Sequence, residues 1–197
     1  MRQFRLIRLG ALVVGLALLW NRGDAQTAAP VALKPLRDGQ RDFDFLIGKW
    51  KYHLRRLENP LTGSTPPKWI EFDGTGECRA IWNGKAQLDT LDVNGPSGHI
   101  EGLTLRLYNP ESRQWSLYWS NAAKGTVDIP TVGSFADGRG EFYDQETLNG
   151  RAILVRFLIL PVSADTIRFE QAYSDDGGKT WELNWVALDT RVKESTR

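Results

Sequence analysis

The stretch AIWNGKAQLDTLDVNGPSGHIEGLTLRLYN, residues 80–109, alternates short mixed runs of apolar and polar residues with turn dipeptides. Asn83-Gly84 is its strongest turn signal, because both central residues of a type I′ hairpin need positive φ and Asn-Gly tolerates this best. No helical pattern separates the runs. The stretch therefore predicts consecutive antiparallel strands joined by hairpins.

The same pattern continues toward both ends of the chain, and Asn149-Gly150 gives a second strong hairpin signal. The turns leave about ten candidate strands, at residues 48–58, 68–82, 85–93, 99–109, 114–121, 131–136, 139–147, 151–160, 165–174 and 180–190. A meander of this length would expose two long edges unless it curls and closes. We therefore expect an all-β fold, an antiparallel up-and-down β-barrel of about ten strands.

The first 25 residues have the three parts of a secretory signal peptide. A start with three arginines precedes an apolar run over residues 9–20, and small residues lead to a cleavage site at Ala25. The apolar run is shorter than the roughly 20 residues that cross a bilayer, which disfavours a membrane anchor. We expect cleavage near Ala25 and a periplasmic or secreted mature protein with no integral membrane segment.

The remaining chain divides into three parts. Residues 26–40 are rich in Ala, Pro and Thr, which is typical of a flexible leader. The barrel is expected over residues 41–191, with a short cap at residues 41–47, and residues 192–197 form a C-terminal tail.

Net charge limits the classes of binding partner, and the cysteine content limits the disulfides that the chain can form. Removing residues 1–25 takes away four arginines and one aspartate, so the formal net charge falls from +1 to −2. A weakly acidic chain without a basic run has no electrostatic footprint for nucleic acid. Cys78 is the single cysteine, so no internal disulfide can form, and we expect it to lie buried in a strand.

The segment SDDGGKTW, residues 174–181, resembles the Asp box of sialidases and related β-propellers. In a propeller the box recurs once per blade, whereas this sequence contains it once. The box is a turn device: short polar side chains bond the backbone, glycine supplies positive φ, and Trp181 packs under the loop. We predict a hairpin turn here with no catalytic part.

A G-x-W motif begins the first predicted strand at Gly48 and Trp50, and Arg191 closes the last one. This resembles the calycin arrangement of lipocalins, in which the first-strand Trp seals one barrel end and a late Arg packs across it. The order FDFLIGKW, the Trp115-to-Trp119 strand, SDDGGKTW and NWVALDTR is similar to a bacterial family catalogued as domain of unknown function 1579 and grouped with the calycins. The resemblance spans about residues 41–191. It implies a barrel with a cavity and a contact between Trp50 and Arg191, and it supplies no catalytic residues.

Strand alternation assigns most aromatic side chains to one face. The ligand-lining residues that this face predicts are Tyr52, Trp119, Gln171, Tyr173 and Trp185, and the same face includes Leu103, Leu105 and Leu107. Arg106 and Asn184 fall on the alternate face, which should meet water. A ten-stranded barrel leaves interior space unless side chains or loops fill it, so both a ligand cavity and a filled core remain open.

Arg156 lies in a run, residues 153–160, that is apolar on both faces. A bulge would turn it inward, where it could hold a ligand carboxylate bidentately. Parity alone places it outward, paired with Glu170 on the adjacent strand. Arg156 is thus a reserve ligand-binding residue for an acidic ligand.

Cofactor signals are sparse. His53 and His99 are the two histidines, and no metal-ligand spacing appears, so we expect no metal. His53 falls on the outer face and His99 follows a glycine-rich turn, so we expect no haem and no other cofactor. Carboxylates are plentiful, but the sequence does not show which of them converge.

Three functions fit these observations. The first is an exported protein that binds a small apolar or amphipathic molecule inside the barrel. The second is an enzyme on the same barrel, an isomerase, lyase or hydrolase, because a fold does not fix a function. The third is a filled barrel that serves as an envelope or interaction module. A cavity would argue against the third, and a pKa-perturbed polar pair inside it would favour the second.

Overall fold

The computed structural model describes residues 37–193, so the predicted signal peptide, most of the predicted leader and residues 194–197 lie outside the described part. The described chain is all-β apart from two short 3₁₀ turns. Its elements are η1 (Asp44–Leu46), β1 (Gly48–Leu57), β2 (Trp69–Ile81), η2 (Trp82–Gly84), β3 (Ala86–Gly95), β4 (Gly98–Asn109), β5 (Gln114–Asn121), β6 (Thr126–Val127), β7 (Thr131–Ala136), β8 (Arg139–Leu148), β9 (Arg151–Ser163), β10 (Thr166–Ser174) and β11 (Glu182–Arg191).

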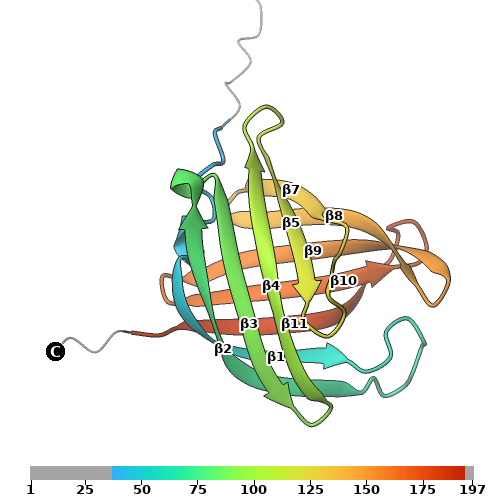
Figure 1. Ribbon diagram of the computed structural model, residues 1–197. Coiled ribbons are helices and arrows are strands. Elements are labelled where there is room, and N and C mark those ends of the chain that lie inside the picture. Colours follow the sequence, from blue (N-terminus) through green and yellow to red (C-terminus); the bar gives the residue numbers. More distant parts are fainter. Residues whose placement is uncertain (1–36, 194–197) are drawn as a thin grey trace, which may run out of the picture. The chain divides into compact units, whose positions relative to one another are not determined.

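The strands form a closed antiparallel barrel, as the sequence predicts (Figure 1). Neighbours pair in the order β4-β3-β2-β1-β11-β10-β9-β8-β7-β5, and pairing of β4 with β5 closes the ring. Ten strands therefore make the wall, and β6 adds a short pairing on β5. No helix within residues 37–193 is long and apolar enough to cross a membrane.

The seam between β5 and β7 is the shortest ladder in the wall. β5 pairs with β7 over Trp115–Leu117 and with β6 over Ser120–Asn121. The chain between β5 and β7, residues 122–130, crosses this gap as a loop that contains β6. The edge of β5 that faces away from β4 thus has two partners along its length.

The end of the barrel beside η1 is tightly packed and is called the packed end here. Phe43 lies in the middle of an aromatic cluster, with its ring 5.1 Å from that of Trp115 and 5.6 Å from that of Phe142. All three side chains are buried and belong to one hydrophobic cluster with Trp50. The short cap that the sequence predicts at residues 41–47 supplies Phe43 and so covers this end.

Trp50 and Arg191 are in contact at the packed end, as predicted. They are paired residues of β1 and β11, and the guanidinium carbon of Arg191 lies 4.2 Å from the Trp50 ring centroid. Arg191 also donates hydrogen bonds to the backbone oxygens of Phe45 and Ile47, at 2.5 and 2.8 Å. Trp50 Nε1 donates to Leu46 O at 2.6 Å. These bonds tie the cap to the first and last strands.

The Asp-box segment is a hairpin loop between β10 and β11. The Asp176 carboxylate accepts hydrogen bonds from the hydroxyls of Ser174 and Thr180, at 2.8 and 2.6 Å, and from two backbone N–H groups of the loop. These donors hold the pKa of Asp176 well below its usual range. Trp181 Nε1 donates to Gly178 O at 3.1 Å. Each polar group of the motif therefore serves the turn, as predicted.

One predicted turn is larger than expected. Asn149 and Gly150 form a two-residue loop with φ of 51° and 78°, as a type I′ hairpin requires. At the other site Ile81 pairs with Ala86, so the loop has four residues rather than two. Trp82, Asn83 and Gly84 all have positive φ there. The Asn-Gly pair marks the left-handed backbone correctly, but the extra residues widen the turn.

Candidate functional site

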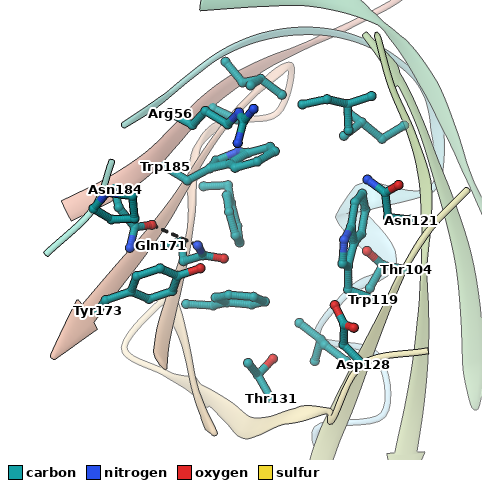
Figure 2. Close-up of a pocket in the computed structure, with 18 of the residues that line it drawn as sticks. Arg56, Thr104, Trp119, Asn121, Asp128, Thr131, Gln171, Tyr173, Asn184 and Trp185 are labelled. Carbon is teal, nitrogen blue, oxygen red and sulfur yellow. Dashed lines mark hydrogen bonds between the residues drawn. The ribbon is translucent and has the colours of Figure 1, made fainter. Parts of the chain in front are cut away.

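A cavity of about 730 Å³ lies inside the barrel (Figure 2). It begins beside the packed end, at Leu46, and reaches the loops at the opposite end, including residues 58–60, 123–124 and 148–149. This opposite end is called the open end here. The interior is therefore not filled by side chains, and the filled-core alternative does not describe this barrel.

The five aromatic and amide residues that the sequence predicts as ligand-lining all border the cavity: Tyr52, Trp119, Gln171, Tyr173 and Trp185. Figure 2 shows Trp185, Gln171 and Tyr173 on one side of the pocket and Trp119 on the other. Leu54, Phe157 and Phe169 also line the cavity. Geometry thus places these residues as predicted, while their role in ligand binding stays a prediction.

Trp119 depends on a glycine of the neighbouring strand. Gly102 of β4 pairs with Asn121 of β5, two residues from Trp119. A Cβ atom at Gly102 would overlap the Trp119 indole and crowd the backbone oxygen of Ser120. Because Gly102 has no side chain, the Trp119 indole has room to pack against β4.

Four polar side chains line the cavity next to the packed end. They are called the floor cluster here: Tyr52, Asp89, Arg106 and Asp189. Arg106 Nη2 lies 2.7 Å from Asp89 Oδ2, and the Tyr52 hydroxyl donates to Asp89 Oδ1 at 3.2 Å. Burial raises the pKa of Asp189 to about 8, and the charge of Asp89 adds to this shift. Asp189 is 7% exposed and its Oδ1 has no hydrogen-bond partner within the described chain.

The inward position of Arg106 reverses the predicted faces of β4. Thr104 and Arg106 line the cavity, whereas Leu103 is among the exposed large apolar residues. Alternation assigned the face with Leu103, Leu105 and Leu107 to the interior because it is the more apolar face, and this assignment is wrong. The ion pair with Asp89 supplies what the prediction lacked, a buried partner that makes an inward arginine stable.

Asn184 is a second residue that the sequence places on the wrong face. The register of β10 and β11 shifts between Gln171 and Ala172, which pair with Trp185 and Leu183 and leave Asn184 as an extra residue. This bulge turns both Asn184 and Trp185 to the cavity. Gln171 Nε2 donates to Asn184 Oδ1 at 2.9 Å, a bond visible in Figure 2.

Three carboxylates border the cavity nearer the open end and are called the acidic wall: Asp128, Asp144 and Glu146. Asp144 and Glu146 are alternate residues of β8, so both point inward after the core residue Phe142. Burial raises the pKa of Asp144 to about 7, and the charges of Glu146 and Asp128 add to it. The pKa of Glu146 is raised by burial and by Asp128. Tyr173 of β10 and Asp144 of β8 both pair with Val155 of the strand between them, and burial raises the pKa of Tyr173 to about 12.

Arg156 does not reach the cavity. It pairs with Tyr143 on the outer face of the barrel, and its guanidinium carbon lies 4.6 Å from the Trp181 ring centroid. The bulge that would have turned it inward is absent from the β8–β9 ladder. The expected partner Glu170 is bonded to Arg168 instead, at 2.6 Å. Arg156 therefore packs against the Asp-box loop, and its prediction as an interior contact is wrong.

The acidic wall was missed because carboxylates are common in this sequence and most of them lie on the predicted outer face. A usable signal existed in EFYDQETL, residues 141–148, where the buried Phe142 fixes the inward parity for Asp144 and Glu146. Among residues 37–193, no three His, Cys, Asp or Glu side chains converge closely enough to hold a metal ion.

Comparisons with known proteins support the fold. No family model and no curated protein matches the sequence, so the resemblance to the bacterial family stays a prediction. The structure is similar to the S-type phycobiliprotein lyase CPES from Guillardia theta, with a TM-score of 0.54 and 12% identity, covering 81% of this chain and 95% of that chain.

Two further solved structures are less similar. Rv2717c from Mycobacterium tuberculosis gives a TM-score of 0.48 at 12% identity, covering 80% of this chain and 99% of that one. A de novo designed fluorescence-activating β-barrel gives 0.41 at 11% identity, covering 80% and 100%. The described chain is thus a lipocalin-like antiparallel β-barrel with a cavity inside it.

Proposed function

We propose that this protein is exported and binds a small amphipathic molecule inside its barrel. The observation that carries the proposal is the cavity of about 730 Å³, a volume typical of small-molecule sites. A barrel that served only as an interaction module would be more stable with this space filled by side chains, because voids forfeit packing contacts.

The lining supports an amphipathic rather than a purely apolar ligand. Indole and phenyl rings supply the apolar area. Several polar side chains that line the same cavity have buried atoms without a hydrogen-bond partner within residues 37–193, among them Thr131 Oγ1, Asn184 Nδ2 and Asp189 Oδ1. Unpaired buried polar atoms are costly, so a ligand that bonds to them gains affinity.

Export is proposed from the sequence alone. The basic start, the apolar run and the small-residue site at Ala25 support cleavage of the first 25 residues. N-terminal sequencing of the protein from its own host should give a mature chain that begins near Gln26. Intact Met1 on the soluble protein would contradict export.

Binding is tested by native mass spectrometry of the protein from its own host, followed by tryptophan fluorescence titration with apolar and amphipathic molecules. We expect a retained ligand and a saturable emission change. Trp185→Ala should weaken binding about tenfold or more, because it removes a large contact area. Trp82→Ala is the control, since Trp82 is 70% exposed and does not border the cavity. Equal affinities for the two variants would contradict the proposed location.

One observation favours an enzyme as the second candidate. Asp144 faces the cavity with a pKa raised to about 7, which suits a group that accepts and returns a proton near neutrality. The test is to incubate the retained ligand with the wild-type protein and with Asp144→Asn, and to compare the masses and retention times of the recovered molecules. Conversion by the wild-type protein alone would favour the enzyme, and unchanged ligand in both samples would favour the binding protein.

A further inference from the structure

The charges that border the cavity are unevenly balanced. Six acidic and three basic side chains line it: Glu58, Asp89, Asp128, Asp144, Glu146 and Asp189 against Arg56, Arg106 and Lys124. Arg106 is already paired with Asp89, and Glu58 is paired with Lys68 outside the cavity. The acidic wall therefore contributes most of the excess negative charge.

Asp144 is the centre of this excess. Both of its carboxylate oxygens are buried without a hydrogen-bond partner within the described chain. Glu146 lies two residues along the same strand face. Lys124 is the positive group that acts on Glu146, whereas the charges that act on Asp144 are the negative ones of Glu146 and Asp128. A carboxylate taken out of water is costly unless a positive or hydrogen-bonding group compensates it, so Asp144 calls for a positively charged partner.

Thr131 gives an independent indication of a ligand at the same place. It is 1% exposed, it borders the cavity, and its hydroxyl has no hydrogen-bond partner within residues 37–193. The register that pairs Val132 with Tyr143 places Thr131 beside Asp144 on the adjacent strand. Figure 2 shows Thr131, Asp128 and the Tyr173 hydroxyl around one part of the pocket.

We propose that the ligand is a small amphipathic amine whose protonated amino group lies between Asp144, Glu146 and the Thr131 hydroxyl. This inference rests on the proposed binding function and specifies its ligand class. An alkylammonium group carries a positive charge and up to three N–H donors, which matches two carboxylates and a hydroxyl that all accept. The apolar body of the ligand then lies against the rings of Phe157, Trp119 and Trp185.

Other ligand classes fit this wall less well. A carboxylate ligand would place a third negative charge beside Asp144 and Glu146, which is repulsive in a partly desolvated site. The side chains of the acidic wall do not converge on a metal geometry. A neutral ligand would leave the charge of the wall uncompensated.

The test uses three probes with the same tail: decylamine, decanol and decanoate, titrated calorimetrically at pH 8 into the mature protein. We expect decylamine to bind about 10-fold to 100-fold more tightly than decanol, because hydrogen bonds to charged groups are strong, and decanoate to bind most weakly. The double variant Asp144→Asn/Glu146→Gln should remove the preference for decylamine and leave the affinity for decanol within about twofold of the wild-type value.

Glu101→Gln is the matched control, because it removes one negative charge from an exposed residue of β4 that does not border the cavity. It should leave the preference for decylamine unchanged. Thermal unfolding and near-ultraviolet circular dichroism of each variant establish that the barrel is intact.

A pH series adds a second readout. Asp144 must be charged to bind the ammonium, so the affinity for decylamine should rise about tenfold from pH 5.5 to pH 8, while the affinity for decanol stays constant. The charges of Asp128 and Lys124 act on these two carboxyls, Asp128 on both and Lys124 on Glu146, and the carboxylates in turn raise the pKa of Tyr173.

Two failures are distinguishable. If decanol or decanoate binds as tightly as decylamine, or if the double variant keeps the preference, the amine inference is wrong and the binding function stands. If no probe binds and the protein from its own host retains nothing, the binding function itself is wrong.

Discussion

The packed end and the cavity are built from the same strands but are stabilised differently. β5 contributes Trp115 to the aromatic cluster and Trp119 to the cavity. β8 contributes Phe142 to the cluster and Asp144 to the acidic wall. Each of these two strands thus has a core residue at one end and a cavity-lining residue toward the other. Substitutions at the two ends of one strand should therefore separate folding from binding.

The largest expected effect is at the packed end. Trp50→Ala should lower the free energy of unfolding by about 3–5 kcal/mol, because it opens a cavity where the first and last strands meet. Trp185→Ala, which enlarges a cavity that already exists, should cost about 1–2 kcal/mol. Urea unfolding of both variants measures the difference. Equal losses would show that the two ends do not differ in their contribution to stability.

The second-largest expected effect is a pH dependence of the free energy of unfolding, caused by two carboxyl groups that line the cavity. The pKa values of Asp144 and Asp189 are raised from 3.8 to about 7 and about 8 in the folded protein. Between pH 4 and pH 8 the folded state therefore binds more protons than the unfolded state, so the free energy of unfolding falls as pH rises. We expect a loss of about 2–4 kcal/mol from pH 5 to pH 8.5, after allowance for water near these groups.

Urea unfolding at several pH values measures this loss. Asp189→Asn should reduce the slope, since it removes one of the two titrating groups. A free energy of unfolding that rises over the same range would contradict the burial of these carboxyls.

Asp144→Asn should stabilise the ligand-free protein at pH 8 by about 1–3 kcal/mol, because it removes a buried charge without a partner. The gain should shrink toward pH 4, where the wild-type carboxyl is neutral in the folded state. Thermal unfolding of the wild type and the variant at both pH values is the measurement. A destabilised variant at pH 8 would indicate a partner for Asp144 in solution.

The smallest effect is the coupling between Trp50 and Arg191. A cation over an indole contributes about 0.5–2 kcal/mol, so a double-mutant cycle with Trp50→Leu and Arg191→Met should give a coupling energy in this range. The hydrogen bonds of Arg191 to the cap backbone are lost in the single variant Arg191→Met and in the double variant alike. Their contribution therefore cancels in the cycle. A coupling energy near zero would mean that Arg191 acts only through the cap.

The sequence predicts the strands well because glycine and asparagine mark the turns. Asn149-Gly150 forms the expected hairpin, and the fold class follows from the number of such turns. The Trp50–Arg191 contact follows from a resemblance rather than from any local pattern. The positive φ of Trp82 could not be predicted from the sequence, because tryptophan has no preference for that backbone conformation.

The site is less predictable because polar side chains face inward there. Alternation assigns a face by apolarity, so it places the rings of Trp119 and Trp185 correctly and the buried Arg106 wrongly. Asn184 is assigned to the wrong face because a bulge interrupts the two-residue alternation of side chains along the strand. An interior polar residue such as Arg106 is identified from its partner on another strand, here Asp89.

The short ladder between β5 and β7 has a consequence for the rates of motion in this barrel. Three residue pairs join these strands, whereas nine join β8 and β9. Backbone segments with few cross-strand bonds open most often, so amide hydrogens in residues 122–130 should exchange with solvent faster than those of β8. Local opening there would let a molecule enter or leave on a timescale much shorter than that of unfolding. The seam, rather than the stability of the whole barrel, would then set the residence time of a bound molecule.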